Sequence, residues 1–211
     1  MIAMVTSLLG GGLLESILNT TDYITNISLN KSTVFFGVSA EIINGIIVTG
    51  IAFILFPILK IYNESFAIGY FGFRIIESLF CIMSAIIPLS LITLSKEYLE
   101  SGFSLVPYFQ TIGNLLITLR SNMTELLIPI FYSFGALLFY SILYKTVLIP
   151  KFISVWGFIG IVLILSLIFF RSGIIINMIL ALPIILNEIF LGIWLIVKGF
   201  NSPAIARLFS N

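Results

Sequence analysis

The sequence predicts an all-α fold: a polytopic membrane helix bundle with six transmembrane helices and one interfacial amphipathic helix. Of its 211 residues, 60% are hydrophobic and only 9% are charged, and the mean hydropathy is +1.21. A soluble domain carries about 25% charged residues, so a bilayer must solvate much of this chain. Inside lipid the backbone must satisfy its own hydrogen bonds, which predicts helices despite the many Ile, Val and Phe residues. We expect one integral membrane domain over residues 1–211.

The first apolar run covers residues 1–18. It has no basic region at its start and no A-x-A cleavage site, and it carries Glu15, so it is a poor signal peptide. We therefore predict a retained first helix, just long enough to cross a bilayer core about 30 Å thick. The natural chain is expected to start upstream of Met1.

Five further apolar runs follow, each long enough to span the bilayer core. They are residues 34–59, 69–95, 123–144, 152–170 and 173–197. Each run ends next to a basic residue, in order Lys60, Lys96, Lys145, Arg171 and Lys198. Short polar connections, such as residues 145–151, predict that the helices they join are antiparallel neighbours.

The segment between the third and fourth runs is ambiguous. Its middle, residues 103–119, is apolar but is interrupted by Pro107, Gln110 and Asn114. Its leucines and isoleucine recur at helical spacing, which favours an amphipathic helix lying along the outer interface. A seventh span is the alternative.

The distribution of Lys and Arg predicts the orientation. With six spans, five basic residues share one side: Lys60, Lys145, Lys151, Lys198 and Arg207. Four lie on the other side: Lys31, Lys96, Arg120 and Arg171. The positive-inside rule then places both termini in the cytoplasm of a cell-membrane protein.

Charged residues fall inside the apolar runs, where each costs about 3 kcal/mol or more on insertion scales. They normally face the bundle interior and pair there. Threading the predicted spans groups these residues and nearby asparagines into two layers. The inner layer, a candidate ligand-binding site, is Arg74, Glu77, Asn187 and Glu188. The second polar layer, toward the outer half, is Glu15, Glu41, Asn44 and Asn177.

Spacing predicts specific contacts within the inner layer. Arg74 and Glu77 are three residues apart and so share a helix face. Glu188 falls at a matching depth on the antiparallel sixth helix. We expect Arg74 to contact both Glu77 and Glu188, joining the third and sixth helices.

The composition excludes several chemistries. There is no histidine, which removes Ser-His and Cys-His catalysis and histidine-ligated zinc or haem. Asp22 is the sole aspartate, so a two-aspartate protease is impossible, and Cys81 is the sole cysteine. We predict no cofactor, no metal site and no catalytic residue. A net charge of +1 implies no nucleic-acid partner.

Three functions fit the inner layer. The leading hypothesis is a binding or transport-like protein that accepts a cation, a proton or a polar head group. A structural or accessory protein, whose charges only specify helix packing, is the alternative. A carboxylate-based membrane enzyme is a distant third. The expected partners are the lipid bilayer and a small polar ligand or ion, and no oligomeric state follows from the sequence.

Several stretches resemble one family. They are F-R-I-I-E at residues 73–77, F-G-A-L-L-F-Y at 134–140, L-I-P-K-F-I-S-V-W-G at 148–157 and N-E-I-F-L-G-I-W-L-I-V-K-G-F-N at 187–201. They resemble the prokaryotic membrane proteins of domain-of-unknown-function family 4386. The resemblance implies a multi-pass bacterial or archaeal membrane protein and no particular activity. It also implies that Arg74, Glu77 and Glu188 belong to the family pattern.

Overall fold

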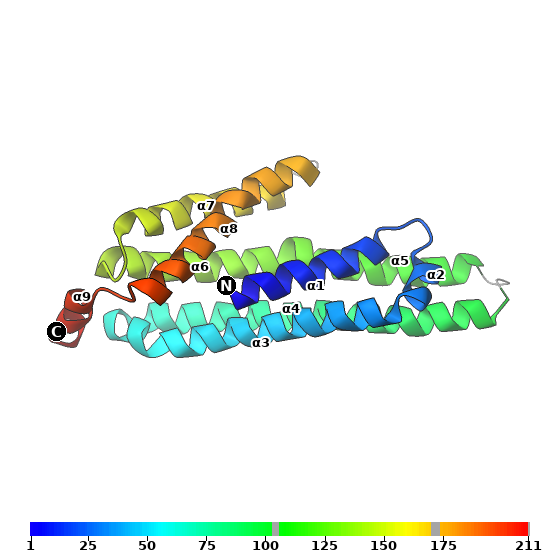
Figure 1. Ribbon diagram of the computed structural model, residues 1–211, viewed down its shortest axis with the longest axis horizontal. Helices are drawn as coiled ribbons and strands as arrows, with labels where there is room; N and C mark the ends of the chain where they lie inside the picture. The colour runs from blue at the N-terminus through cyan, green and yellow to red at the C-terminus, as the bar shows by residue number, and fades with distance from the viewer. Residues whose placement is uncertain (103–105, 170–173, 211) are drawn as a thin grey trace. The chain divides into compact units, whose positions relative to one another are not determined.

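The computed structural model describes residues 1–102, 106–169 and 174–210. Within these ranges every regular element is a helix, which confirms the predicted all-α class (Figure 1). The elements are α1 (Ile2–Leu18), α2 (Tyr23–Leu29), α3 (Lys31–Tyr62), α4 (Glu64–Glu100), α5 (Val106–Asn122), the π-helical turn η1 (Met123–Leu127), α6 (Ile128–Thr146), α7 (Lys151–Phe169), α8 (Ile174–Val197) and α9 (Ser202–Ser210).

In the described ranges, five helices are long and apolar enough to cross a membrane. They are Lys31–Tyr62, Glu64–Glu100, Val106–Thr146, Lys151–Ile168 and Ile176–Val197. The apolar helix α1, at 17 residues, is shorter than these. The structure thus has the apolar helices of a membrane bundle.

The segment predicted to lie along the interface differs from the expectation. From Val106 onward it is helical, and it continues through η1 into α6 as one helix of 41 residues. Pro107 does not break it, because a proline in the first helical turn leaves no backbone hydrogen bond unmade. A separate interfacial helix is therefore not confirmed. Residues 103–105 and 170–173, which include predicted boundaries and Arg171, lie outside the described residues.

The chain forms two compact units. The first unit consists of Met1, Thr49–Glu77 and Pro129–Asn211, and the second of Ile2–Val48 and Ser78–Ile128. The boundaries fall within α3 and α4 and at the start of α6. Each unit has a hydrophobic core of its own.

The first unit is built around α6, α7 and α8. The helices α7 and α8 pack against each other, as Figure 1 shows. Glycine permits this closeness at Gly160, where a Cβ atom would meet Ile184 at 2.8 Å. Gly157 lies against the Tyr140 ring, at 2.5 Å from the position of a Cβ atom. These contacts bring α6 and α8 within reach of α7.

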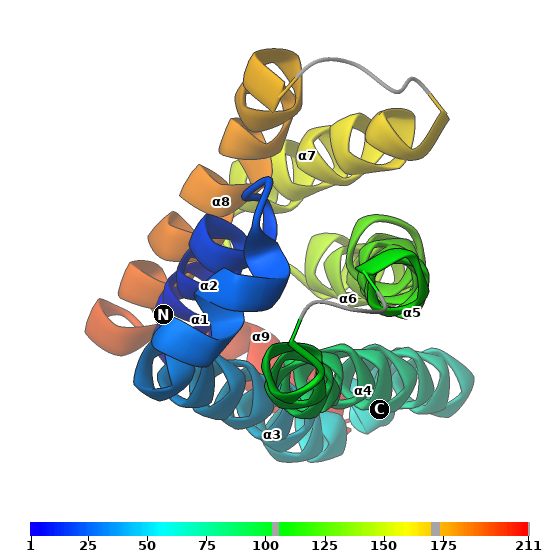
Figure 2. The same ribbon diagram turned by 90° about the vertical axis from the view of Figure 1, so that its right-hand side faces the viewer.

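The second unit holds α1 and α2 against the first part of α3 (Figure 2). A Cβ atom at Gly10 would come within 2.8 Å of the Glu41 side chain, and one at Gly37 within 2.7 Å of Leu14. The Ser95 hydroxyl of α4 donates a hydrogen bond to the backbone carbonyl of Ile24 in α2. In the second unit, α1 therefore packs closely against α3 at Glu41.

Candidate functional site

Arg74 and Glu77 of α4 form a buried ion pair in the first unit. Nη1 of Arg74 donates to both carboxylate oxygens of Glu77, at 3.1 and 2.9 Å. Their side chains are only 14% and 6% exposed. The contact that the three-residue spacing predicted is confirmed.

Two tyrosine rings complete the surroundings of Arg74. Its guanidinium carbon lies 5.0 Å from the centroid of the Tyr132 ring and 5.7 Å from that of Tyr70. The negative face of an aromatic ring attracts a cation, more strongly where water is excluded. The Arg74 charge is thus stabilised by one carboxylate and two aromatic rings.

The sequence predicted a contact between Arg74 and Glu188, but no hydrogen bond or ion pair joins them in the described residues. Instead, the Tyr132 hydroxyl of α6 donates to Oε1 of Glu188 at 2.7 Å. Within the described part of the chain, no ion pair involves Glu188. The Arg74 guanidinium forms its ion pair with Glu77, one turn away on the same helix. Tyr132 lies between the two charges: its ring contacts Arg74 and its hydroxyl binds Glu188.

This cluster of Arg74, Glu77, Tyr132 and Glu188, the α4–α8 cluster, contains one more acidic than basic group. Arg74 is always protonated, and its charge is matched by Glu77. Glu188 receives a hydrogen bond from a neutral hydroxyl, and no cation pairs with it in the described residues. When ionised, Glu188 leaves an excess negative charge that a proton or a cation would cancel.

Asn187, the fourth predicted residue of the inner layer, is completely buried. Its Oδ1 accepts a hydrogen bond from the Tyr140 hydroxyl at 2.5 Å, and its Nδ2 donates to the Ile153 carbonyl at 2.9 Å. The amide therefore ties α8 to α6 and α7. Both ends of the amide are engaged within the protein, which favours a packing role.

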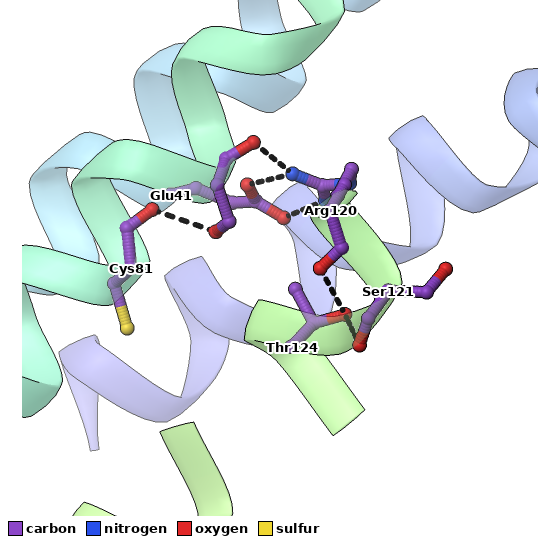
Figure 3. Close-up of polar contacts among 6 residues, drawn as sticks. Glu41, Cys81, Arg120, Ser121 and Thr124 are labelled. Atoms are coloured by element: carbon purple, nitrogen blue, oxygen red, sulfur yellow. Dashed lines mark hydrogen bonds and ion pairs between the residues drawn. The ribbon is translucent and has the colours of Figure 1, made fainter. Parts of the chain in front are cut away.

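Glu41 has a partner that the sequence did not identify. In the second unit, Arg120 of α5 forms a two-pronged pair with it, from Nη1 to Oε2 at 2.9 Å and from Nη2 to Oε1 at 2.5 Å (Figure 3). Nη1 also donates to the Ser84 carbonyl at 2.7 Å. Arg120 is only 6% exposed, although the sequence analysis counted it among the basic residues on the outer side of the membrane.

The hydroxyl groups near Arg120 donate hydrogen bonds to backbone carbonyls (Figure 3). The Thr124 hydroxyl lies 3.2 Å from the Arg120 carbonyl, to which it donates, and the Ser84 hydroxyl donates to the Cys81 carbonyl at 2.9 Å. The pair of Glu41 and Arg120 is balanced in charge. Its geometry fits a structural tie between α3, α4 and α5.

The other residues of the predicted second layer come from both units. Asn44 is buried in α3, one turn from Glu41, whereas Glu15 of α1 is exposed. Asn177 belongs to the first unit, and its buried Oδ1 has no hydrogen-bond partner among the described residues. The ion pair of the second layer is that of Glu41 with Arg120.

The described residues contain no group of three or more His, Cys, Asp or Glu side chains that could hold a metal ion. Among known families, the one described as Domain of unknown function (DUF4386) matches residues 1–199. No curated protein and no solved structure matches the chain.

Proposed function

The chain belongs to the DUF4386 family, and from this premise we propose that it binds or transports a proton or a monovalent cation at Glu188. In this proposal the chain forms a single integral domain in a prokaryotic cell membrane. Its partners are the lipid bilayer and this ion, with no nucleic acid.

The charge of the α4–α8 cluster carries the proposal. The sequence analysis expected one of three ligands: a cation, a proton or a polar head group. The excess carboxylate of this cluster favours a cation or a proton. An uncompensated carboxylate at bilayer depth is costly, and such residues commonly mark ion pathways and proton relays. Tyr132 fixes one oxygen of Glu188 by its 2.7 Å hydrogen bond and so orients the carboxylate for a ligand.

The proposed arrangement in the membrane has six spans, with α1 as the first and both termini in the cytoplasm. Burial of Arg120 supports this orientation, because it removes one basic residue from the outer side. Five basic residues then face three, Lys31, Lys96 and Arg171, which strengthens the positive-inside bias. In this arrangement α5 extends from α6 into the outer headgroup region.

Thermal unfolding of the purified full chain tests the site. Titration with hydrogen ions, and separately with sodium chloride against choline chloride, is followed in wild type and in Glu188→Gln. A ligand that binds only the folded state raises the melting temperature in proportion to its occupancy. We expect the melting temperature of wild type to respond to the ion that binds at Glu188. Glu188→Gln, which lacks the carboxylate, should lose that response.

Glu15→Gln is the matched control, because Glu15 is an exposed glutamate in the second unit. It should keep the wild-type response to both ions. If Glu188→Gln responds to pH and sodium as wild type does, ion binding at Glu188 is refuted.

The alternative is a structural or accessory role. The observation that favours it is the ion pair of Arg120 with Glu41, which joins α5 to α3 and so specifies how these helices pack. Under this alternative, neither ion alters the melting temperature of wild type through Glu188.

A further inference from the structure

A pocket lies in the first unit, at the end of α8. We propose that this pocket binds the phosphate of an anionic phospholipid through Lys198. The ligand, the residues and the location all differ from those of the α4–α8 cluster.

The pocket has a volume of about 270 Å³ and is lined by the α6–α7 connection, the last turn of α8 and the α8–α9 connection. Lys198 is the cation in its lining, and the lining residues, all of them described, include no carboxylate. Trp194 and Phe200 supply apolar surface beside it. A cation next to apolar walls suits a phosphate that is attached to hydrocarbon.

Asn201 holds the two connections together. Its backbone N–H donates to the Leu148 carbonyl at 2.9 Å, and its Nδ2 donates to the Val147 carbonyl at 3.4 Å. Val147 has a φ of 55°, which is strained for a β-branched residue, and Gly199 turns the chain with a φ of 67°. The pocket wall is therefore a fixed backbone arrangement.

Further basic residues flank, in the sequence, the segments that line this pocket. Nζ of Lys145 lies 6.0 Å from the Phe66 ring centroid, and Nζ of Lys151 lies 5.2 Å from that of Tyr144. Arg207 follows on α9, and residues 189–211 contain no acidic side chain. Glu64 is paired with Lys60 at 3.0 Å. Each lysine or arginine near an anionic leaflet strengthens attraction to it.

Aromatic side chains indicate that this end of the unit lies at headgroup level. The rings of Trp156 and Trp194 lie 6.0 and 6.3 Å from that of Phe190. Tryptophan and tyrosine concentrate at membrane interfaces. On α9, Phe209 is 72% exposed, two residues after Arg207. A phospholipid of the adjacent leaflet, rather than a soluble anion, is therefore the occupant we infer.

Lipid retention tests the proposal. The purified full chain in neutral detergent is mixed with phosphatidylglycerol or with phosphatidylcholine of the same acyl chains, and bound lipid is counted by native mass spectrometry. We expect phosphatidylglycerol to be retained preferentially. Lys198→Gln should weaken its retention about fivefold, the effect of one lysine at an anionic surface. Lys198→Arg should restore retention.

Lys60→Gln is the control, because Lys60 lies outside the pocket and already pairs with Glu64. It should retain the lipid as wild type does. Equal retention by wild type and Lys198→Gln would overturn the proposal. Displacement of the lipid by millimolar inorganic phosphate would overturn it too, by showing a site for the free anion. Neither result touches the proton or cation response assigned to Glu188.

Discussion

Arg74 and Arg120 are both buried, but their charges are compensated by different groups. Arg120 meets a carboxylate and a backbone carbonyl, all through hydrogen bonds of 2.5 to 2.9 Å. Arg74 meets one carboxylate and two aromatic rings, and a second carboxylate lies beyond the Tyr132 hydroxyl. The charges around Arg120 balance, whereas the group around Arg74 contains one carboxylate more than it has cations. This difference separates a structural tie from a candidate binding site.

Removing Arg120 should strand Glu41. Arg120→Leu is expected to cost about 3–5 kcal/mol of unfolding free energy, because an unpaired carboxylate remains buried. The double change Arg120→Leu, Glu41→Leu should recover part of that loss. Unfolding of the purified protein in detergent, followed by circular dichroism, measures both. An absence of recovery in the double variant would contradict a mutual pair.

The partner of Arg74 can be identified in the same way. Arg74→Leu should also destabilise the protein strongly, since it leaves Glu77 unpaired. Adding Glu77→Leu should recover more stability than adding Glu188→Leu, because the ion pair joins Arg74 to Glu77. The three unfolding free energies decide this point. Greater recovery with Glu188→Leu would favour the helix-bridging contact expected from the sequence.

The sequence predicted contacts within a helix better than contacts between helices. Arg74 and Glu77 were predictable because three-residue spacing fixes a shared face. The partners of Glu188 and Glu41 were not, because they depend on how each helix rotates about its axis. Arg120 could have been suspected from charge balance, since the apolar runs contain several glutamates and only Arg74 as a cation. Its place in an ambiguous segment concealed it.

At the scale of the helix, glycine determines how closely neighbours approach. Gly157→Ala should destabilise the first unit by about 1–3 kcal/mol, because the new methyl group would overlap the Tyr140 ring. That ring also carries the hydroxyl bound to Asn187. Gly72→Ala is the matched control, since the new methyl group would meet no atom within 4 Å beyond its own chain neighbours and the backbone of its own helix. Melting temperatures of the two variants give the comparison, and equal values would argue against tight packing at Gly157.

The apolar runs correctly predicted helices, but the break expected before residue 123 was wrong. Apolar runs predicted α3, α4, α6, α7 and α8 because a bilayer demands continuous apolar helices. The break expected before residue 123 is absent. There, η1 accommodates the chain with a wider turn, so the helix continues past polar residues. Asn114 is also accommodated, because it accepts a hydrogen bond from Tyr23 at 2.9 Å.

For the whole molecule, the proposed orientation places α9 in the cytoplasm. Cysteine labelling tests it, and the natural Cys81 is buried and should give little background. A cysteine at the exposed position Ser202 should resist a membrane-impermeant maleimide in intact cells and react after lysis. A cysteine at the exposed position Thr21 should react in intact cells. Labelling of Ser202→Cys from outside would place the C-terminal end of the chain on the other face.

The length of α4 has a consequence for the membrane itself. Between Glu64 and Lys96 the helix carries about 31 residues, or ~46 Å at 1.5 Å per residue, with Arg74 and Glu77 as the charges within it. Even a tilt of about 40° leaves ~35 Å to be covered, against a hydrocarbon core of about 30 Å. This hydrophobic mismatch should favour thicker bilayers. Vesicles of longer-chain lipids should therefore raise the melting temperature of the reconstituted protein, and the local lipid layer around α4 should stretch to meet it.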